Sequence, residues 1–222
     1  MCGRFAFYSP SEAAAALFGA SGSVEVQPRY NIAPTQYVAA VRNDEEQRRE
    51  IVMLRWGLVP FWAKDPAIGN RMINARAETV AEKPSYRAAY RHRRCIVLAD
   101  GFYEWQRQGD RKVPHFISLA SGEPFALAGL WELWKDKETG DSLQTTTLIT
   151  MNANEFMMPL HQRMPVVLEP ATADEWLAGS NDLLDDVAER TPALQAWPVD
   201  RRVNNARNEG EELIEAAGDI VR

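Results

Sequence analysis

Short runs of β-branched and aromatic residues, separated by turn residues, constrain the fold of this chain more than any other feature. They cover residues 37–41, 50–59, 95–105, 115–119, 125–134 and 143–151. Such residues favour strands. Turn residues stand between several runs, at 43–46, at Gly109-Asp110 and at 139–141, and they predict short reversals of the chain. We therefore expect antiparallel strands, with residues 37–41 and 50–59 forming one pair.

Several short helices are expected around these strands. Residues 9–12 read Ser-Pro-Ser-Glu, a capping box that predicts a helix through Phe18, ended by Gly19. Residues 78–92 have a helical pattern interrupted at Pro84, Thr172 with Glu175 predicts a helix ending near residue 179, and residues 182–190 predict another. The fold class is therefore α+β, with an antiparallel, partly closed, β-barrel-like sheet and peripheral short helices.

Composition limits the broad class of protein. A chain of 222 residues with 45% hydrophobic residues can bury one substantial core, and no repeat or Gly/Ser linker divides it, so we expect one domain over residues 1–222. No apolar run is long enough for a membrane span or a signal peptide, which predicts a soluble, cytoplasmic protein. The net charge of −6 argues against non-specific coating of nucleic acid, although it leaves room for a local basic groove.

Two cysteines, Cys2 and Cys95, are too few for a disulfide framework and have no metal-ligand spacing. We therefore expect neither a metal nor a cofactor. Cys95 lies in an apolar run and is expected in the core. Since no coiled-coil pattern or obvious interface is present, we expect a monomer.

Cys2 offers the most informative chemistry. Its small side chain favours removal of Met1, which would leave an α-amine and a thiol on one residue. Their reference pKa values are about 8 and about 8.5, so both can act as nucleophiles near neutral pH after modest shifts. An aldehyde is the matching electrophile, because the amine forms an imine and the thiol closes on it to give a thiazolidine. The alternative is that Cys2 is a small buried hydrophobic residue.

Several motifs occur together with this N-terminus. They are Met1-Cys2-Gly3-Arg4-Phe5, Arg29-Tyr30-Asn31-Ile32-Ala33-Pro34, Trp56-Gly57-Leu58-Val59-Pro60, Asn74-Ala75-Arg76-Ala77-Glu78-Thr79, Asp100-Gly101-Phe102-Tyr103-Glu104-Trp105, His161-Gln162-Arg163-Met164-Pro165 and the late run Val203-Asn204-Asn205-Ala206-Arg207-Asn208-Glu209-Gly210. In this order they resemble the SRAP family, the SOS-response-associated peptidases or abasic-site processing proteins, from residue 2 to about residue 213.

The resemblance implies a catalytic group and a way of exposing it. By motif, the catalytic residues are Cys2, Asn74, Glu104 and His161, and the phosphate-binding arginine is Arg76. It also implies that the chain removes its own Met1, which is where the peptidase name originates.

The catalytic residue types suit these implied roles. Glu104 lies among aromatic residues of a predicted strand, where desolvation would raise the pKa of its carboxyl into a range useful for proton transfer. His161, with an ordinary pKa of about 6.5, can shuttle protons during opening of a cyclic sugar. Asn74 can donate and accept hydrogen bonds beside Cys2. The alternatives are a solvent-facing glutamate at the end of a strand and a structural histidine.

Candidate DNA-contacting residues are cationic or aromatic. Arg76 would share a face with Asn74 in an extended segment, and its guanidinium fits a phosphate, although an internal salt bridge is the alternative. Arg4, Arg163 and Arg207 are weaker candidates for the same groove. Trp62 is the expected wedge between bases.

The sequence thus predicts a protein of the DNA damage response that binds abasic sites in single-stranded DNA and crosslinks to them through Cys2. β-Elimination from the imine would add a weak lyase activity. Three alternatives stand beside this reading. They are a glutamine amidotransferase with an N-terminal nucleophile, which would be expected to carry an Asn-Gly-Asp-like segment that we do not find, a non-covalent reader of damaged DNA, and a peptidase acting on other proteins.

Overall fold

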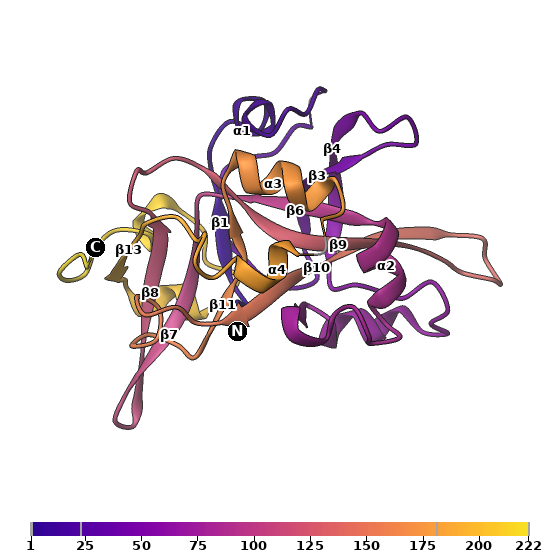
Figure 1. The fold of residues 1–222 in the computed structure, drawn as a ribbon. Helices are drawn as coiled ribbons and strands as arrows, with labels where there is room; N and C mark the ends of the chain where they lie inside the picture. Colours follow the sequence, from indigo (N-terminus) through magenta and orange to yellow (C-terminus); the bar gives the residue numbers. More distant parts are fainter. Residues whose placement is uncertain (1, 23, 181, 222) are drawn as a thin grey trace.

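A closed ring of five strands forms the larger part of the fold. The computed structural model describes residues 2–22, 24–180 and 182–221 (Figure 1). The ring runs in the order β3 (Tyr37–Asn43), β4 (Arg49–Trp56), β10 (Ser142–Asn152), β9 (Phe125–Lys135), β6 (Arg94–Ala99) and back to β3. All contacts within it are antiparallel except the parallel contact between β4 and β10. Short strands β5 (Asn74–Arg76), β11 (Arg163–Pro165) and β12 (Val167–Leu168) pair with β10 or β9.

A second, antiparallel sheet lies beside the ring. Its strand order is β13 (Leu194–Pro198), β8 (Arg111–Leu119), β7 (Gly101–Gln108), β1 (Phe5–Phe7) and β2 (Arg29–Ile32). The predicted α+β class, with a barrel-like sheet and peripheral short helices, is confirmed, and the predicted pairing of residues 37–41 with 50–59 corresponds to β3 and β4. The turns predicted at Gly109 and Gly140 are confirmed by the positive φ angles of both glycines, 60° and 78°.

The expectation of one strand over residues 95–105 is wrong, because the chain leaves the ring at Asp100 and begins β7 in the second sheet. The Asp100 carboxylate accepts hydrogen bonds from the backbone N–H groups of Tyr8 and Ser9, at 2.6 and 2.8 Å, and from the Ser9 hydroxyl at 2.5 Å. Since these donors follow β1 in the sequence, Asp100 holds the N-terminal strand beside β7. The break therefore joins the ring to the second sheet.

The helices are short and lie around the sheets. The α-helices are α1 (Ser11–Leu17), α2 (Arg87–His92), α3 (Pro170–Leu177) and α4 (Leu183–Asp186), and the 3-10 helices are η1 (Pro66–Arg71), η2 (Ala77–Thr79), η3 (Arg201–Asn204) and η4 (Glu211–Leu213). Within the described residues, no helix is long and apolar enough to cross a membrane.

Four helix predictions need correction. The capping box at residues 9–12 does not form, because Ser9 bonds to Asp100 and the Ser11 hydroxyl donates to Val24 O, so α1 begins without a side-chain cap. The capping box of α3 pairs Thr172 with Glu169 in place of Glu175. Residues 78–92 and 182–190 are only partly helical, because α2 begins after Pro84, at Arg87, and α4 ends at Asp186.

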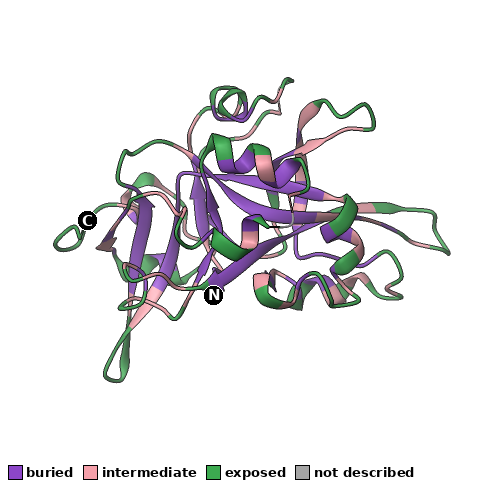
Figure 2. Ribbon diagram, viewed as in Figure 1, coloured by how far each residue is buried: buried purple, intermediate pink, exposed green. Residues whose placement is uncertain are grey.

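The core fills the ring and the space below the helices, as the buried strands in Figure 2 show. Cys95, expected in the core, is fully buried in β6. The indole of Trp176 in α3 is also fully buried and donates to Cys95 O at 2.9 Å. A smaller cluster around Tyr103 and Phe116 packs within the second sheet. The larger cluster also contains Phe5, Phe102 and Ile117 of the second sheet, so one main core joins the two sheets, and the smaller cluster lies on the opposite face of the second sheet.

The backbone crosses itself at close range at Gly57 and Gly69, and this crossing positions the chain that leads to β5. Gly57 has a φ of +126°, and a Cβ placed there would lie 2.5 Å from Gly69 O. On either side of this contact, Gly57 N donates to Thr146 O at 2.8 Å and Leu58 N donates to Met72 O at 3.1 Å. Only glycine satisfies both the backbone angle and the space. The crossing therefore sets the path of residues 70–74.

We expect Gly57→Ala to lower the free energy of unfolding by about 3 kcal/mol or more, because strained φ and overpacking each cost about 1–3 kcal/mol. Gly109→Ala is the matched control, since Gly109 also has a positive φ but open space around it, and it should cost only about 1–2 kcal/mol. Urea unfolding of the two variants measures the difference. Equal losses would contradict the importance of the crossing.

Candidate active site

Cys2 lies where the two sheets meet. Its side chain is fully buried, and the segment from Cys2 to Arg4 leads directly into β1. The backbone N–H of Tyr103 donates to Arg4 O at 2.9 Å, which continues the antiparallel pairing of β1 with β7 toward the N-terminus. The register therefore brings Cys2 alongside the part of β7 that contains Glu104. Met1 lies outside the described residues.

Asn74 connects Cys2 to the ring. Its side-chain Nδ2 donates to the Cys2 carbonyl at 2.7 Å. Asn74 is the first residue of β5, and its register partner is Leu148 of β10, so the amide is held by the ring. Among the described residues, the buried Oδ1 of Asn74 has no hydrogen-bond partner. This oxygen is thus an available acceptor next to Cys2.

The buried Glu104 carboxyl acts electrostatically on the Cys2 thiol. Glu104 is only 3% exposed, and burial raises the pKa of its carboxyl, an effect that the nearby His161 opposes. Burial, and secondly the Glu104 carboxylate, raise the pKa of the Cys2 thiol above its usual range. The thiol is therefore protonated at neutral pH in this arrangement, and its proton must be transferred before the sulfur can attack.

His161 lies in the segment between β10 and β11 and is held by its own turn. Its Nδ1 accepts a hydrogen bond from Arg163 N–H at 2.9 Å and lies 3.0 Å from Arg163 O. Its charge lowers the pKa of Glu104, so the two side chains are close in space. The structure thus brings together all four residues predicted as catalytic, Cys2, Asn74, Glu104 and His161.

Arg163 fastens this turn from within. Its guanidinium forms an ion pair with Glu78 and donates to Asn152 Oδ1 and to Thr150 O, each at 2.7 Å. The side chain is only 13% exposed. Because Glu78 belongs to the motif that contains Asn74, Arg163 links that motif to the His161 turn. These contacts place Arg163 as a positioning residue beside the site.

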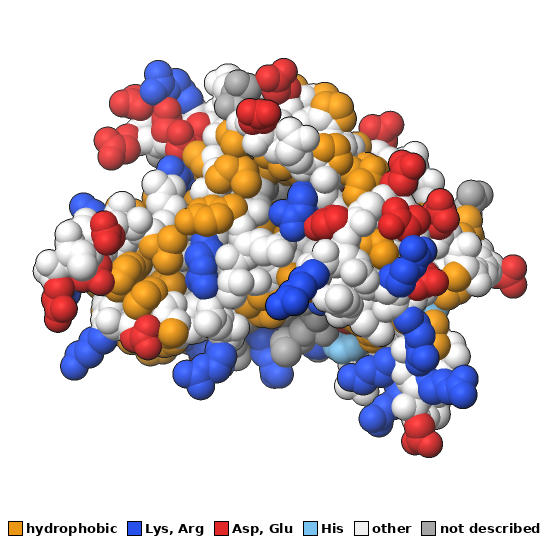
Figure 3. All heavy atoms as spheres, turned by 180° about the vertical axis from the view of Figure 1, so that it is seen from behind, with side chains coloured by type: hydrophobic (Ala, Val, Ile, Leu, Met, Phe, Trp, Pro, Cys, Tyr) orange, Lys and Arg blue, Asp and Glu red, His pale blue; other side chains and the backbone are white. Residues whose placement is uncertain are grey.

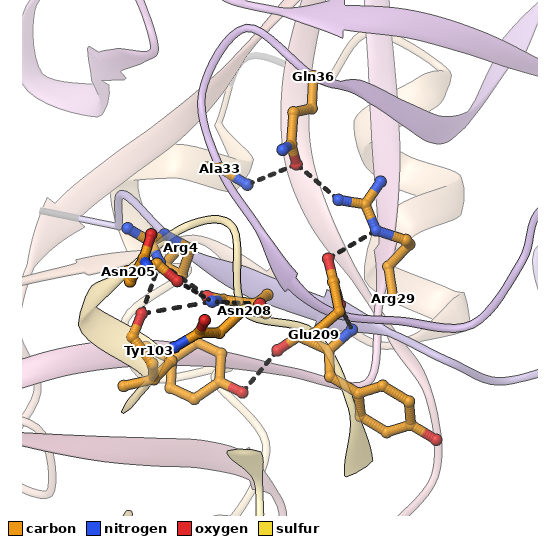
Figure 4. Close-up of polar contacts among 11 residues, drawn as sticks. Arg4, Arg29, Ala33, Gln36, Tyr103, Asn205, Asn208 and Glu209 are labelled. Carbon is orange, nitrogen blue, oxygen red and sulfur yellow. Dashed lines mark hydrogen bonds and ion pairs between the residues drawn. The ribbon is translucent and has the colours of Figure 1, made fainter. Parts of the chain in front are cut away.

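Arg4 is also engaged in internal contacts, as the network in Figure 4 shows. Its Nη1 donates to Asn31 Oδ1 and to Val203 O, each at 2.7 Å, and its guanidinium lies 5.9 Å from the ring centroid of Trp105. Since Arg4 is two residues from Cys2, these contacts hold the N-terminal segment in place.

Asn31 and Glu209 complete this network, and sequence reasoning assigned them no role. The fully buried Asn31 side chain donates to the carbonyls of Val203, Asn205 and Asn208. Glu209 forms an ion pair with Arg29 at 2.7 Å and accepts from Tyr30 N–H at 2.9 Å (Figure 4). The sequence did contain a signal for this contact, because Asn31 and Glu209 each lie in one of the motifs that resemble the family. The late motif therefore fastens β2, and through Arg4 it fastens β1.

Arg76 and Trp62 are open to solvent. Arg76 is exposed two residues after Asn74, and in the described part of the chain it forms no ion pair within 4.0 Å. Trp62 is 47% exposed beside Phe61, which is 57% exposed. Trp62 lines a shallow groove of about 460 Å³ together with Lys64 and Arg71. These side chains are free to contact a ligand at the surface, as is the exposed Arg207.

The sequence profile of the SOS response associated peptidase (SRAP) family matches residues 1–206. The chain belongs to this family. The resemblance found in its motifs is thereby confirmed, and the Met-Cys-Gly start is assigned to the SRAP family rather than to the amidotransferases. Within the described residues, no group of three or more His, Cys, Asp or Glu side chains is placed to hold a metal ion.

Two relatives and two solved structures illustrate which proteins this chain resembles. The abasic site processing protein YoqW of Bacillus subtilis is 43% identical, over 97% of this chain and 100% of its own length. YedK of Escherichia coli, also named an abasic site processing protein, is 35% identical over 97% and 99%. A Bordetella bronchiseptica crystal structure has a TM-score of 0.76 at 27% identity, covering 90% of this chain and all of its own. A Bacteroides thetaiotaomicron structure shares the fold, with a TM-score of 0.84 at 24% identity, over 97% and 100%.

We expect Glu104→Gln to raise the melting temperature at pH 7. Burial raises the pKa of Glu104 in the folded protein, so between the unfolded and the folded pKa the folded state binds more protons, and stability falls as pH rises through this window. The neutral glutamine removes this loss of stability, so the variant should be more stable than wild type at pH 7. The difference in melting temperature should shrink toward pH 4, where Glu104 is largely protonated in both the folded and the unfolded state. Calorimetry at both pH values measures it. A variant less stable than wild type at pH 7 would contradict the desolvation argument.

Proposed function

We propose that this protein processes abasic sites in single-stranded DNA by forming a covalent crosslink at Cys2. Family membership and relatives named abasic site processing proteins over almost their full length support this proposal. The observation that carries it is the hydrogen bond from Asn74 to the Cys2 carbonyl, which holds the N-terminal thiol beside a buried carboxyl. In this proposal the protein acts as a single-domain monomer in the cytoplasm, in response to DNA damage.

Removal of Met1 comes first in the proposed sequence. Hydrolysis of the Met1–Cys2 peptide bond consumes one water and releases methionine and the Cys2 α-amine. While the peptide bond is intact, its nitrogen cannot form an imine. The Asn74 contact is made to the Cys2 carbonyl, which is retained after cleavage. The same hydrogen bond can therefore orient Cys2 before and after processing.

The amine then attacks the aldehyde of the ring-opened deoxyribose. We assign His161 and Glu104 to the ring opening, in which the proton of the C1′ hydroxyl is removed and the ring oxygen is protonated. Addition of the amine gives a carbinolamine. Protonated Glu104, favoured by its raised pKa, donates a proton to the hydroxyl, which leaves as water. A protonated imine and the Glu104 carboxylate remain.

The thiol closes the ring in the final step. The Cys2 thiol is protonated because burial and Glu104 raise its pKa, and the Glu104 carboxylate left by the previous step can accept this proton. The sulfur then bonds to the imine carbon and gives the neutral thiazolidine. One water is lost overall, and Glu104 returns to its protonated form. Alternatively, loss of a proton next to the imine carbon and departure of the 3′ phosphate would cleave the strand, a secondary lyase reaction.

DNA binding is assigned to side chains that are free at the surface. Arg76, next to the catalytic Asn74 and without an ion pair among the described residues, is the proposed phosphate contact. The exposed Trp62 is the proposed stacking residue, because single strands offer unpaired bases to aromatic faces. We assign Arg4 and Arg163 to positioning rather than to direct phosphate binding, since their guanidinium groups donate to internal acceptors.

The crosslink can be tested by intact mass measurement before and after incubation with a single-stranded oligonucleotide that carries one abasic site. We expect a starting mass without Met1 and a heat-stable product equal to protein plus DNA minus one water. Cys2→Ala should form no such product.

Controls separate the crosslink from other outcomes. An oligonucleotide with a reduced abasic site, which has no aldehyde, should give no product with the wild-type protein. A product that persists in Cys2→Ala would implicate a lysine amine. No product from protein shown to begin at Cys2 would reject the trapping mechanism and favour a non-covalent reader of damaged DNA.

We expect Arg76→Gln to weaken DNA binding without changing the rate of crosslinking at saturating DNA. Loss of one phosphate contact should reduce the slope of log affinity against log salt by about 0.7 for single strands. Lys137→Gln, an exposed substitution in the β9–β10 turn, is the control. A slower reaction at saturating DNA with an unchanged salt slope would instead place Arg76 in the chemistry.

A further inference from the structure

The hairpin formed by β7 and β8 extends beyond the body of the second sheet (Figure 1). Residues 107–112 are all exposed, and a Cβ placed at Gly109 would meet no atom within 4 Å. The hairpin carries Arg107, Arg111 and Lys112, with Asp110 at the turn. Figure 3 shows Lys and Arg side chains gathered on this arm, with an acidic side chain at its tip. It is a local excess of positive charge in a chain of net charge −6.

The positive charges of the hairpin are not neutralised within the protein. Arg107 and Lys112 are direct partners in the β7–β8 register, so their side chains leave the same face of the sheet as neighbours. Like charges placed opposite each other destabilise a strand pair. In the described part of the chain, no acidic group lies within ion-pair distance of Arg107, Arg111 or Lys112. An anion bound along the hairpin would relieve this repulsion.

The base of the hairpin lies next to the candidate active site. Glu104 and Arg107 are three residues apart on β7, which corresponds to about 10 Å of strand. Gln106 Nε2 donates to Pro159 O at 3.1 Å, in the segment that leads to His161. The hairpin is therefore held against the catalytic turn on one side and extends away from it. Arg111, which pairs with Gln108, leaves the same face of the sheet as Glu104 and lies on the path of a strand that leaves the site in this direction, whereas Arg107 and Lys112 leave the opposite face of the narrow hairpin.

We infer that the β7–β8 hairpin binds the phosphate backbone of the DNA strand on one side of the abasic site. This inference rests on the proposed function. The charged residues begin about 10 Å from Glu104, and phosphates follow one another every 3.4 Å or so along a stacked strand, so the contacts fall about three to five nucleotides from the lesion. A polyanion matches the row of unneutralised charges, and the contact adds affinity without touching the reacting atoms.

The test uses Arg107→Gln/Arg111→Gln, which removes one charge from each face of the hairpin, with a matched control, Lys135→Gln/Lys137→Gln. The control removes two exposed charges from the β9–β10 hairpin, at the other side of the molecule in Figure 1. Binding is measured over a range of salt to single strands of 15 nucleotides with a central tetrahydrofuran abasic analogue, which has no aldehyde and cannot be crosslinked. We expect the hairpin variant to lower the salt slope by about 1.4 and the affinity at 0.1 M salt by about 25-fold, and the control to change neither.

Shorter oligonucleotides locate the contact. With two nucleotides on each side of the analogue, the hairpin variant should bind like wild type, and extension on one side only should restore the difference. A hairpin variant that matches the control on the long strand, while wild type binds normally, would overturn the hairpin contact and leave the proposed function intact. Wild-type protein that binds none of these strands would reject the proposed function and this inference together.

Discussion

The hydrogen bond between Asn74 and the Cys2 carbonyl joins the closed ring to the second sheet across the hydrophobic core that the two sheets share. Asn74 is fixed by its pairing with β10 in the closed ring, and Cys2 by the pairing of β1 with β7 in the second sheet. Asp100 ties the same two parts together where the chain passes from β6 to β7. The site therefore depends on the fit between two sheets, since neither sheet contains all of its residues.

The supporting contacts follow the same principle of linking distant segments. Arg163 fastens the His161 turn to Glu78, which is part of the Asn74 motif. On the other side, Arg4 and Asn31 fasten the N-terminal segment to the late motif around Val203. In both cases a half-buried guanidinium donates to several acceptors at once, as does the buried Asn31 amide, which satisfies polar groups that would be costly to bury alone. Several motif residues thus hold the segments of the site in position and do not face the reacting atoms.

Local sequence patterns predicted the long strands β3, β4 and β6 to β10, because runs of branched and aromatic residues and turn glycines are short-range signals. They did not predict the short strands β1, β2, β5 and β11 to β13. They failed at Asp100 and Ser9, because these two residues bond to each other across the fold. They also failed at Thr172, because the nearby Glu169 forms the capping box in place of Glu175. Asp100 and Ser9 are 91 residues apart in sequence, and no pattern at either position indicates the contact. For the site, local chemistry supplied suitable residue types, but only the family resemblance indicated that Asn74, Glu104 and His161 would meet. The internal partners of Arg4 and Arg163 became visible only in three dimensions.

The complete burial of Cys2 has a consequence for oxidative damage. Oxidants and alkylating agents react with exposed thiolates, whereas this thiol is buried and, because its pKa is raised, protonated at neutral pH. A cysteine in this state resists conversion to sulfenic acid and higher oxides. Conditions that damage DNA often include such oxidants. The burial that slows the thiol's general reactivity would therefore preserve it under the conditions in which the proposed substrate forms.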